Sequence, residues 1–532
     1  MAITRRDIFK FGAIGGVGLA LPIGRSIAAG TPSTAASNVM PLQFANPFRR
    51  PSVLQQIGTY KDTGQPFFEV SQRQGSANWL RNGTPTTVFG YNGEVPGPTI
   101  VADSSGDFAR PNTTVVRMRN NLPPRHPFGH EFTTSTHLHG SASLPQYDGY
   151  ASDVTPPGYY KDYIYPNFQE ARTLWYHDHG VHHTAQNAFT GLAGQYHLHD
   201  AQERATLPQG EFDVPMTIND TQLDAQGQVS YDDHSQTYEM GDIILVNGVP
   251  WPNMPVKQRI YRFRVLNASI SRSYRPQLST GDSVYVVATD GGLVPDAQAV
   301  KFWRHGSAER YEILIDFRKY PVGTKIQLLN LSNPNNIDYA STKQIMQFEV
   351  TGDAFDKGDP TWNQIPARPN PDSLVMKLNP AAAVRTRRFA VDRSNGLWQF
   401  GGKTWEDVID TNYQFTVADV IPDSTEIWEI ENRSGGWFHP VHIHLVDFKI
   451  LSRNGAPPFA WEKGPKDVVY IGEGETVRVL MQFKNQTGRY MIHCHNLVHE
   501  DHDMMGQFRV GADTPNNDPM LSAPAKPNGV DE

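Results

Sequence analysis

The chain contains a single cysteine, Cys494, among 532 residues, so it cannot form a disulfide bond within itself. Its thiol is therefore an inert buried group, a catalytic nucleophile or a metal ligand. The chain also lacks a basic run, and its formal net charge is −8. An acidic protein without a basic patch is poorly suited to nucleic acid or to an anionic membrane, so we expect neither as a partner.

Long apolar segments are also lacking, because the best candidate, residues 11–23, is short and rich in glycine. Such a segment does not span a bilayer comfortably, so we expect no stable membrane span. Arg5 and Arg6 precede it in a pattern similar to the twin-arginine consensus, and Ser26–Ala28 follows it as a candidate cleavage site. We interpret residues 1–28 as a twin-arginine signal peptide and expect export in folded form to a bacterial periplasm or the extracellular space. A short membrane anchor is the alternative.

Long helical periodicity is absent, whereas short apolar or β-branched runs are frequent. The 45 glycines and 40 prolines separate strand-length segments at close spacing, which is typical of an all-β sandwich or barrel architecture. We predict one short helix over residues 184–192. The predicted strands include Thr114–Met118, Ile243–Val246, Ile260–Leu266, Val284–Ala288, Tyr311–Phe317, Phe389–Val391 and Val477–Phe483.

Composition divides the rest of the chain into three predicted β-domains, over residues 45–200, 211–350 and 374–511. Residues 351–373 are rich in proline, aspartate and asparagine, and we interpret them as a linker between domains. Residues 512–532 have little apolar content, so we expect a flexible tail. Hydrophobic residues make up 38% of the chain, which suffices for a core in each domain.

The lone cysteine lies in the segment best suited to bind a metal. Cys494, His499 and Met504 follow one another at intervals of five and offer a thiolate, an imidazole and a thioether. One further imidazole would complete the trigonal site of two histidines and one cysteine, with a weak axial methionine, that is diagnostic of blue copper. A methionine at this spacing has no purpose for zinc, which makes a zinc hydrolase the least favoured alternative.

Pairs of histidines with one residue between them exceed what random placement of 19 histidines would give. Residues i and i+2 of a strand point to the same face, so each pair can present two imidazoles together. His439, three residues before one pair, can complete the Cys494 site. Four of the five pairs, all except His197/His199, then leave eight imidazoles for a second centre, and these suit three copper ions with open positions. The pairs are His137/His139, His177/His179, His197/His199, His442/His444 and His493/His495.

Four segments resemble, in order and separation, the copper-binding signatures of multicopper oxidases. They are HLHG at 137–140, WYHDHG at 175–180, HPVHIH at 439–444 and HCHNLVHEDHDMM at 493–505. The last two are most similar to the bilirubin oxidases and bacterial spore-coat laccases of that family. Further similarity covers nearly the whole mature chain, in YNG at 91–93, PGPTI at 96–100, LVNG at 245–248, YRFRVLNASISRS at 261–273 and ATDGG at 288–292.

The resemblance implies three consecutive cupredoxin-like domains and four copper ions, one of type 1, one of type 2 and a type 3 pair. It also implies that Asp148 and Glu500 are catalytic proton donors near the trinuclear site, although a surface or hydrogen-bonding carboxylate is the alternative for each. It assigns His439, Cys494, His499 and Met504 to type 1 copper, His137 and His442 to type 2 copper, and His139, His177, His179, His444, His493 and His495 to the type 3 pair.

The implied activity couples one-electron oxidation of phenols, aromatic amines or bilirubin-like tetrapyrroles to the four-electron reduction of dioxygen to water. We expect dioxygen and a small aromatic donor as partners, and a monomer. An axial Met504 should keep the type 1 potential below that of relatives with a non-coordinating residue there. One alternative is a cuprous or other metal oxidase. Such relatives often carry a methionine-rich insertion over the type 1 site, whereas the 13 methionines of this chain are scattered. Another is a copper-free cupredoxin scaffold, but no ligand position is missing.

Trp437, two residues before His439, is a candidate cover of the type 1 site and a candidate donor contact, with ordinary core packing as the alternative. The middle domain has only two unpaired histidines, so we expect a scaffold that frames the substrate side. The histidines expected in structural, supporting or surface positions are His182, His183, His197, His199, His234, His305 and His502.

Overall fold

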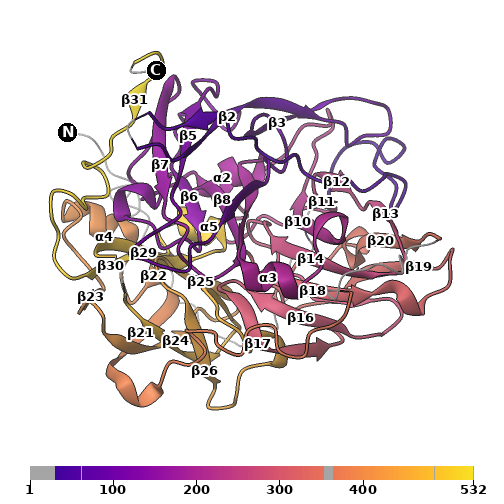
Figure 1. The fold of residues 1–532 in the computed structure, drawn as a ribbon. Helices are drawn as coiled ribbons and strands as arrows, with labels where there is room; N and C mark the ends of the chain where they lie inside the picture. The colour runs from indigo at the N-terminus through magenta and orange to yellow at the C-terminus, as the bar shows by residue number, and fades with distance from the viewer. Residues whose placement is uncertain (1–29, 31, 62, 353–362, 485, 531–532) are drawn as a thin grey trace, which may run out of the picture.

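The computed structural model describes residues 30–530 apart from 31, 62, 353–362 and 485. The predicted signal peptide and part of the predicted linker therefore lie outside the described residues. The described residues form six sheets, two in each of three successive regions of the chain (Figure 1). The predicted all-β fold is confirmed, whereas the exact domain boundaries remain predictions.

The first domain packs a six-stranded sheet on a four-stranded sheet around a core that includes Phe89, Leu138 and Tyr176. The larger sheet contains β1 (Gly58–Thr59), β2 (Pro66–Ala77), β3 (Thr86–Tyr91), β5 (Thr114–Asn120), β7 (Tyr159–Tyr165) and β31 (Lys526–Pro527). The smaller sheet contains β4 (Ile100–Asp103), β6 (Thr136–His139), β8 (Arg172–Asp178) and β9 (Ala193–His199).

The middle domain has a seven-stranded and a four-stranded sheet around a core that includes Val265, Ile313 and Phe348. The larger sheet contains β10 (Asp213–Thr221), β11 (Ile243–Val246), β12 (Val249–Pro250), β14 (Ile260–Asn267), β16 (Val284–Thr289), β17 (Gly292–Val300) and β18 (Arg310–Asp316). The smaller sheet contains β13 (Asn253–Val256), β15 (Pro276–Leu278), β19 (Lys325–Asn330) and β20 (Gln344–Val350).

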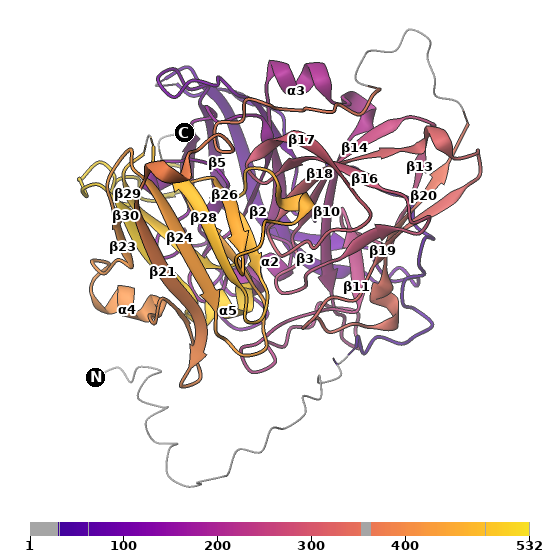
Figure 2. The ribbon, with the colours of Figure 1, turned by 90° about the horizontal axis from the view of Figure 1, so that it is seen from below.

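The third domain has two five-stranded sheets, and its apolar core includes Cys494 and Met504. One sheet contains β21 (Ala383–Ser394), β22 (Leu397–Phe400), β24 (Thr425–Asn432), β26 (Phe448–Arg453) and β28 (Thr476–Gln482). The other contains β23 (Ala418–Val420), β25 (His439–Ile443), β27 (Val468–Ile471), β29 (Gly488–Cys494) and β30 (Met505–Val510). In Figure 2 this orange and yellow domain lies opposite the pink middle domain, with the purple first domain between and behind them.

The helices are short, and among the described residues none is long and apolar enough to cross a membrane. The predicted helix after the second histidine pair is confirmed as α2. The first two backbone N–H groups of α2 donate to the carboxylate of Asp501 in α5, each at 2.9 Å. The helices are α2 (Thr184–Phe189), α3 (Ala201–Thr206), α4 (Trp405–Asp410), α5 (Leu497–Asp501), and the short η1 (Pro145–Tyr147), η2 (Gly210–Phe212), η3 (Phe317–Lys319), η4 (Ala340–Lys343), η5 (Pro380–Ala382) and η6 (Ala460–Glu462).

The three domains repeat one topology. One sheet of each domain contains a parallel strand pair at an equivalent position in its strand order. These pairs are β2/β5, β10/β14 and β21/β24. In the other sheet, the parallel pairs β4/β9, β13/β20 and β23/β30 occupy equivalent positions. Strands β6 and β8 of the first domain therefore correspond to β25 and β29 of the third, and to β15 and β19 of the middle domain. Two of these three equivalent pairs carry the predicted ligand histidines.

The segment after residue 511 differs from the expected flexible tail. Strand β31 pairs with β7, and the side chain of Arg489 binds Asp518 at 2.6 Å. Gln146 also donates to the carbonyl oxygen of Asn516 at 3.0 Å. Backbone pairing and polar contacts hold this segment against the first and third domains, and neither depends on the apolar content from which flexibility was predicted.

A buried group of ions joins the first domain to the middle domain. Arg262 and Arg264 of β14 are fully buried and contact Glu203 of α3, Asp213 and Glu312. Burial alone would raise the pKa of Glu203, but Arg262, the His199 hydrogen bond and Arg264 outweigh burial and hold it well below its usual range. Removing one partner of such a group leaves an uncompensated buried charge, which costs about 3 to 5 kcal/mol.

We predict that Glu203→Gln lowers the free energy of unfolding at neutral pH by about 3 kcal/mol. A carboxylate whose pKa is lowered by folding stabilises the protein above its unfolded pKa, and this stabilisation disappears as the pH falls toward the folded value. The loss should therefore shrink as the pH falls below about 4. Denaturant unfolding measures the effect, and Asp372→Asn, at an exposed ion pair with Lys377, is the control. Equal stability of the two variants would contradict the prediction.

Candidate metal centres

One candidate centre surrounds Cys494 in the core of the third domain. Cys494 ends β29, His439 begins β25 and His499 lies in α5. Sγ of Cys494 lies 3.3 Å from Nδ1 of His439 and 3.7 Å from Nδ1 of His499, and the two nitrogens are 3.3 Å apart. The three donor atoms converge on one point, as a trigonal site requires.

Burial favours the uncharged forms of the three side chains of this centre. All three side chains are fully buried. Burial lowers the pKa of His439 to about 3 and the pKa of His499 well below its usual range, so both imidazoles are neutral and able to bind a metal. Burial also raises the pKa of the Cys494 thiol far above its usual range. A metal ion reverses this effect, because a coordinating thiol is deprotonated outright.

Local contacts turn both imidazoles toward the sulfur. Nε2 of His439 lies 2.8 Å from the Ser434 hydroxyl, and Nε2 of His499 lies 3.1 Å from the Asn496 side-chain nitrogen. The Nδ1 atoms are therefore the ones that face Cys494. The side-chain oxygen of Asn496 also caps α5, which fixes the helix that carries His499.

Met504 is tied to both neighbouring ligand segments. Its backbone N–H donates to the carbonyl of His499 at 3.0 Å, and its carbonyl accepts from the N–H of Cys494 at 3.1 Å. Its side chain is fully buried in the same apolar cluster as Cys494. The thioether is thus held in a dry environment beside the candidate centre, as its predicted axial role requires.

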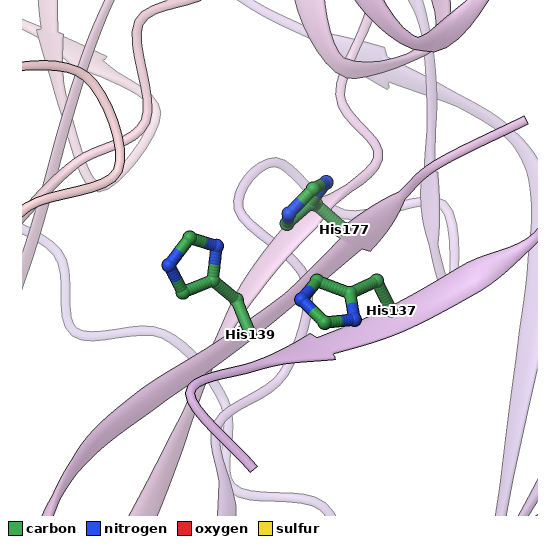
Figure 3. A group of neighbouring side chains, drawn as sticks. All are labelled: His137, His139 and His177. Atoms are coloured by element: carbon green, nitrogen blue, oxygen red, sulfur yellow. The ribbon is translucent and has the colours of Figure 1, made fainter. Parts of the chain in front are cut away.

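A larger group of histidines lies where the first and third domains meet. Strand β6 carries His137 and His139, and its pairing with β8 places His177 opposite His137. Figure 3 shows these three rings beside one another on the two neighbouring strands. Strands β25 and β29 repeat the arrangement in the third domain, with His442 opposite His493. Equivalent strands of the two domains thus bring their histidines together.

Two groups are defined by distances between Nε2 atoms. The first consists of His137 and His442, whose Nε2 atoms are 3.4 Å apart. In the second, Nε2 of His493 lies 3.2 Å from Nε2 of His179 and 3.1 Å from Nε2 of His444. Each group combines residues from the first and third domains. A metal bound to either group would therefore link the two domains.

The third group consists of His139, His177 and His495, whose ring centroids lie 5.1 to 5.8 Å apart. Within the described residues, Nδ1 of His139, Nε2 of His177 and both ring nitrogens of His495 are buried without a hydrogen-bond partner. An unsatisfied buried polar atom costs about 1 to 3 kcal/mol, and a bound metal ion would satisfy these atoms. The donor set therefore fits copper. Groups of two, three and three imidazoles also match the assigned type 2 copper and type 3 pair.

Backbone carbonyl groups hold the outer side of several rings. Nδ1 of His137 donates to the carbonyl of Asp148, and Nδ1 of His442 donates to that of Asp467 at 2.8 Å. Nδ1 of His177 donates to the carbonyl of the next residue at 2.7 Å. Each bond fixes the proton on Nδ1 and leaves the Nε2 lone pair facing inward, which is how proteins orient metal-binding imidazoles.

Burial favours the neutral form of seven of the eight histidines of this larger centre. Burial is the largest cause that lowers the pKa of His177 to about 3 and the pKa of His179 to about 4. A neutral imidazole is the form that binds a metal ion. Burial also lowers the pKa well below its usual range in His137, His139, His442, His444 and His495.

The two predicted acids contact two different histidines of the second group, and their pKa values shift in opposite directions. Oδ2 of Asp148 lies 2.8 Å from Nδ1 of His444, and burial raises the pKa of Asp148 well above its usual range. Oε2 of Glu500 lies 2.9 Å from Nδ1 of His493. Burial alone would raise the pKa of Glu500, but His493 and His179 outweigh it and lower the pKa to about 2. The surroundings therefore favour the protonated form of Asp148 and the ionised form of Glu500.

Strand alternation joins the two centres. In β29, the side chain of Cys494 belongs to the apolar core of the third domain, while His493 contacts the second histidine group. His495 lies on the same side as His493, in the third group. Three consecutive residues, His493, Cys494 and His495, therefore supply ligands to both centres. This agrees with the alternation of side chains along a strand, which directs Cys494 to one side and its two neighbours to the other.

Aromatic side chains cover the Cys494 centre. The ring of Trp398 in β22 lies 3.8 Å from that of His499 and is fully buried. Trp437 lies 5.9 Å from the His499 ring and is partly exposed. Tyr238 of the middle domain lies 5.7 Å from Trp437. Trp437 thus packs against the core and also reaches the surface, so both of its predicted roles are compatible with its position.

Two functional contacts have no counterpart among the predicted site residues. Oδ1 of Asp467 lies 3.1 Å from Nε2 of His139. Arg310 of the middle domain donates to the same oxygen at 2.7 Å. The expectation that the middle domain only frames the substrate side is therefore incomplete, because one of its side chains reaches the larger centre. Neither residue belongs to a histidine motif, so the spacing rules that found the ligands could not find them.

The remaining histidines lie outside both centres. His199 binds Glu203 at 2.9 Å, and His197 binds Gln195 at 2.8 Å, which agrees with a structural role. His182 contacts the carbonyl of Asp501 at 3.2 Å, so it supports the segment after Glu500.

Comparison with known proteins identifies the family. The chain matches the family models described as multicopper oxidase over residues 73–203 and 373–514. It is 39% identical over 480 residues to a bilirubin oxidase of Albifimbria verrucaria, covering 85% of this chain and 77% of that protein. It is 31% identical over 517 residues to a laccase of Bacillus subtilis (strain 168), covering 87% and 97%. The crystal structure of McoA multicopper oxidase from Aquifex aeolicus matches with a TM-score of 0.74 at 28% identity, covering 87% and 100%.

The chain therefore belongs to the multicopper oxidase family. It is an enzyme whose three two-sheet domains are cupredoxin-like, and copper is the cofactor that this family membership implies. The resemblance drawn from the four histidine signatures is confirmed.

We predict that removing copper with a chelator lowers the melting temperature. A metal that binds only the folded protein stabilises it by about 4 kcal/mol per site at a thousandfold excess over its dissociation constant. Calorimetry of metal-free and copper-loaded protein measures the difference, and a magnesium-loaded sample is the control, because Mg²⁺ prefers oxygen ligands. Identical melting temperatures with and without copper would contradict binding at these buried centres.

Proposed function

We propose that the enzyme couples the one-electron oxidation of small aromatic donors to the four-electron reduction of dioxygen to water. The observation that carries this proposal is the pair of centres joined by His493, Cys494 and His495. One centre is built for single-electron exchange with a donor, and the other gathers enough imidazoles for three ions. Their covalent connection supplies the path between them.

Four copper ions complete this proposal. His439, Cys494, His499 and Met504 would hold one type 1 copper. The pair His137 and His442 would hold type 2 copper, and His139, His177, His179, His444, His493 and His495 the type 3 pair. When bound, copper would supply reversible one-electron chemistry at the first centre and a binding place for dioxygen at the second. The protein supplies neutral, oriented imidazoles and excludes water from both.

Protons for the product water come from the protein in this proposal. Burial favours the protonated form of Asp148 beside His444, whereas His493 and His179 favour the ionised form of Glu500. The two carboxyl groups therefore have different roles, Asp148 as the proton donor and Glu500 as the group that receives a replacement proton. Their contacts with two different histidines of the second group support both roles.

The donor would meet the protein at Trp437. The ligands of the Cys494 centre are fully buried, whereas Trp437 is partly exposed and lies beside His499. Phenols, aromatic amines and tetrapyrroles present flat rings that stack on an indole. The similarity to a bilirubin oxidase and to laccases supports donors of this class.

We also propose that the amino-terminal signal directs export of the folded, monomeric enzyme to the periplasm or beyond.

We predict that Cys494→Ser abolishes the intense blue colour and the oxidase activity while leaving most of the fold intact. A hydroxyl cannot replace the thiolate that binds copper in blue sites. Visible absorption, oxygen uptake with 2,6-dimethoxyphenol and far-ultraviolet circular dichroism test this. The matched control is Ser434→Ala, which keeps the thiolate and loses only the hydroxyl beside His439. Activity retained without Cys494 would refute the assignment.

We predict that Asp148→Asn slows oxygen consumption by about 10²- to 10⁴-fold, because an amide cannot donate the proton. Donor oxidation without oxygen should remain fast, as the Cys494 centre is unchanged. In the wild type, activity should fall as the pH rises through the raised pKa of Asp148, and the variant should lose this dependence. Stopped-flow reduction under nitrogen and steady-state oxygen uptake separate the two steps. A variant with a normal oxygen step would remove Asp148 from the proton path.

We predict that Trp437→Leu raises KM for bilirubin and 2,6-dimethoxyphenol about tenfold with little change in kcat. Loss of an aromatic stacking partner costs about 0.5 to 1.5 kcal/mol beyond the lost area, which corresponds to this factor. The panel should also include Cu(I) and Mn(II), whose oxidation does not depend on stacking. Unchanged KM for the aromatic donors would show that they bind elsewhere. A strong preference for Cu(I) or Mn(II) would instead identify a metal oxidase.

A further inference from the structure

A buried ion pair joins all three domains next to the larger histidine centre. Asp467 immediately precedes β27 in the third domain, and Arg310 begins β18 in the middle domain. Nη1 of Arg310 donates to Oδ1 of Asp467 at 2.7 Å, and Nη2 donates to Oδ2. Nε of Arg310 donates to the carbonyl of Thr173 in β8 of the first domain at 3.0 Å. Both charged side chains are about 1% exposed.

Asp467 of this ion pair contacts one histidine of each of two pairs, His139 of His137/His139 and His442 of His442/His444. Oδ1 of Asp467 lies 3.1 Å from Nε2 of His139, and the carbonyl of Asp467 accepts from Nδ1 of His442 at 2.8 Å. His137 contacts the carbonyl of Asp148 through Nδ1. His139, two residues later on the same strand, is therefore held through the opposite nitrogen. Its Nδ1 is the buried atom without a partner among the described residues.

We propose that Arg310 and Asp467 are positioning residues that make Nδ1, not Nε2, the copper-binding atom of His139. A carboxylate that accepts from the Nε2–H group fixes the tautomer whose lone pair is on Nδ1. The bidentate arginine fixes the plane of that carboxylate. The middle domain, to which no copper ligand is assigned, thus takes part in building the trinuclear site. This inference rests on the proposed function, because it presumes copper at the larger centre.

The ion pair occupies space that a side chain at Gly140 would fill. A Cβ atom on Gly140, the glycine of HLHG, would come within 2.6 Å of both Nη2 of Arg310 and Oδ2 of Asp467. Gly140 also has a φ of +88°, which disfavours other residues. The absence of a side chain directly after His139 therefore makes room for the ion pair.

A second carboxylate fixes the arginine from the middle domain. Asp290, in the ATDGG segment, accepts from the backbone N–H of Arg310 at 2.6 Å and from that of Val468 at 3.2 Å. It also pairs with Lys466 at 2.9 Å. Buried charges require compensation of this kind, since an unpaired one is costly. The network explains the resemblance of ATDGG to the family, which the copper signatures left without a role.

Asp467→Asn tests the proposal. An amide oriented either way places its NH₂ group against Arg310 or against the Nε2–H group of His139, so a donor faces a donor. Asp447→Asn is the matched control, because the Asp447 side chain is only 10% exposed and pairs with Arg172 at 2.6 Å but contacts no histidine in the described structure. Arg310→Lys is a second variant that keeps the charge and loses the bidentate geometry.

The readouts are copper content, the electron paramagnetic resonance spectrum of type 2 copper, the near-ultraviolet absorption of the type 3 pair and the blue absorption of type 1 copper. Asp467→Asn should lose copper and change the type 2 and type 3 signals while the blue absorption stays. Arg310→Lys should show the same change in weaker form, and Asp447→Asn should match the wild type. A crystal structure of the Asp467→Asn protein should show the His139 ring rotated.

Two other outcomes would overturn the proposal in different ways. If Asp467→Asn and Arg310→Lys keep all the wild-type copper signals and lose only stability, the pair is a structural bridge alone. If the wild-type protein itself shows no type 2 or type 3 signal after copper loading, the proposed function fails and this inference fails with it.

Discussion

The structure depends on the desolvation of eight imidazoles at the boundary between two domains and of two imidazoles and one thiol in the core of the third domain. Burial removes water from these groups and favours the neutral form of nine of the imidazoles and of the thiol, since the charged forms of histidine and cysteine lose more hydration than the neutral forms. Neutral imidazoles at 3.1 to 3.4 Å from one another leave lone pairs facing lone pairs. Cations resolve both problems, because they accept the lone pairs and stabilise the thiolate. The same burial that makes the metal-free site unfavourable prepares it for copper.

The repeated domain topology explains why the larger centre lies between the first and third domains. Strands β6 and β8 correspond to β25 and β29, and in each pair the ligand histidines lie on the two strands or directly after their ends. The equivalent strands of the middle domain, β15 and β19, contain no histidine. The middle domain contributes in other ways, through Arg310 beside the larger centre and Tyr238 beside Trp437. The first and third domains thus supply the ligand histidines, whereas the middle domain supplies side chains that contact the surroundings of the two centres.

The ligands could be predicted from sequence because their geometry is local. Alternation along a strand has a period of two, so His493, Cys494 and His495 divide between two faces whatever surrounds them. The partners of those ligands could not be predicted, because Asp467 and His139 are 328 residues apart and Arg310 and Asp467 are 157 apart. No spacing rule connects such positions. The ordered segment after residue 511 was missed for a related reason, since pairing with β7 depends on a partner far away in the chain.

The most direct test of the account is anomalous diffraction at the copper edge from crystals of the copper-loaded enzyme. We expect four peaks, one between Cys494, His439 and His499, and three among the eight remaining histidines, with Nδ1 of His139 directed at its metal. Fewer peaks in the larger centre, or a metal at the cysteine alone, would contradict the claim that both centres bind copper and work together.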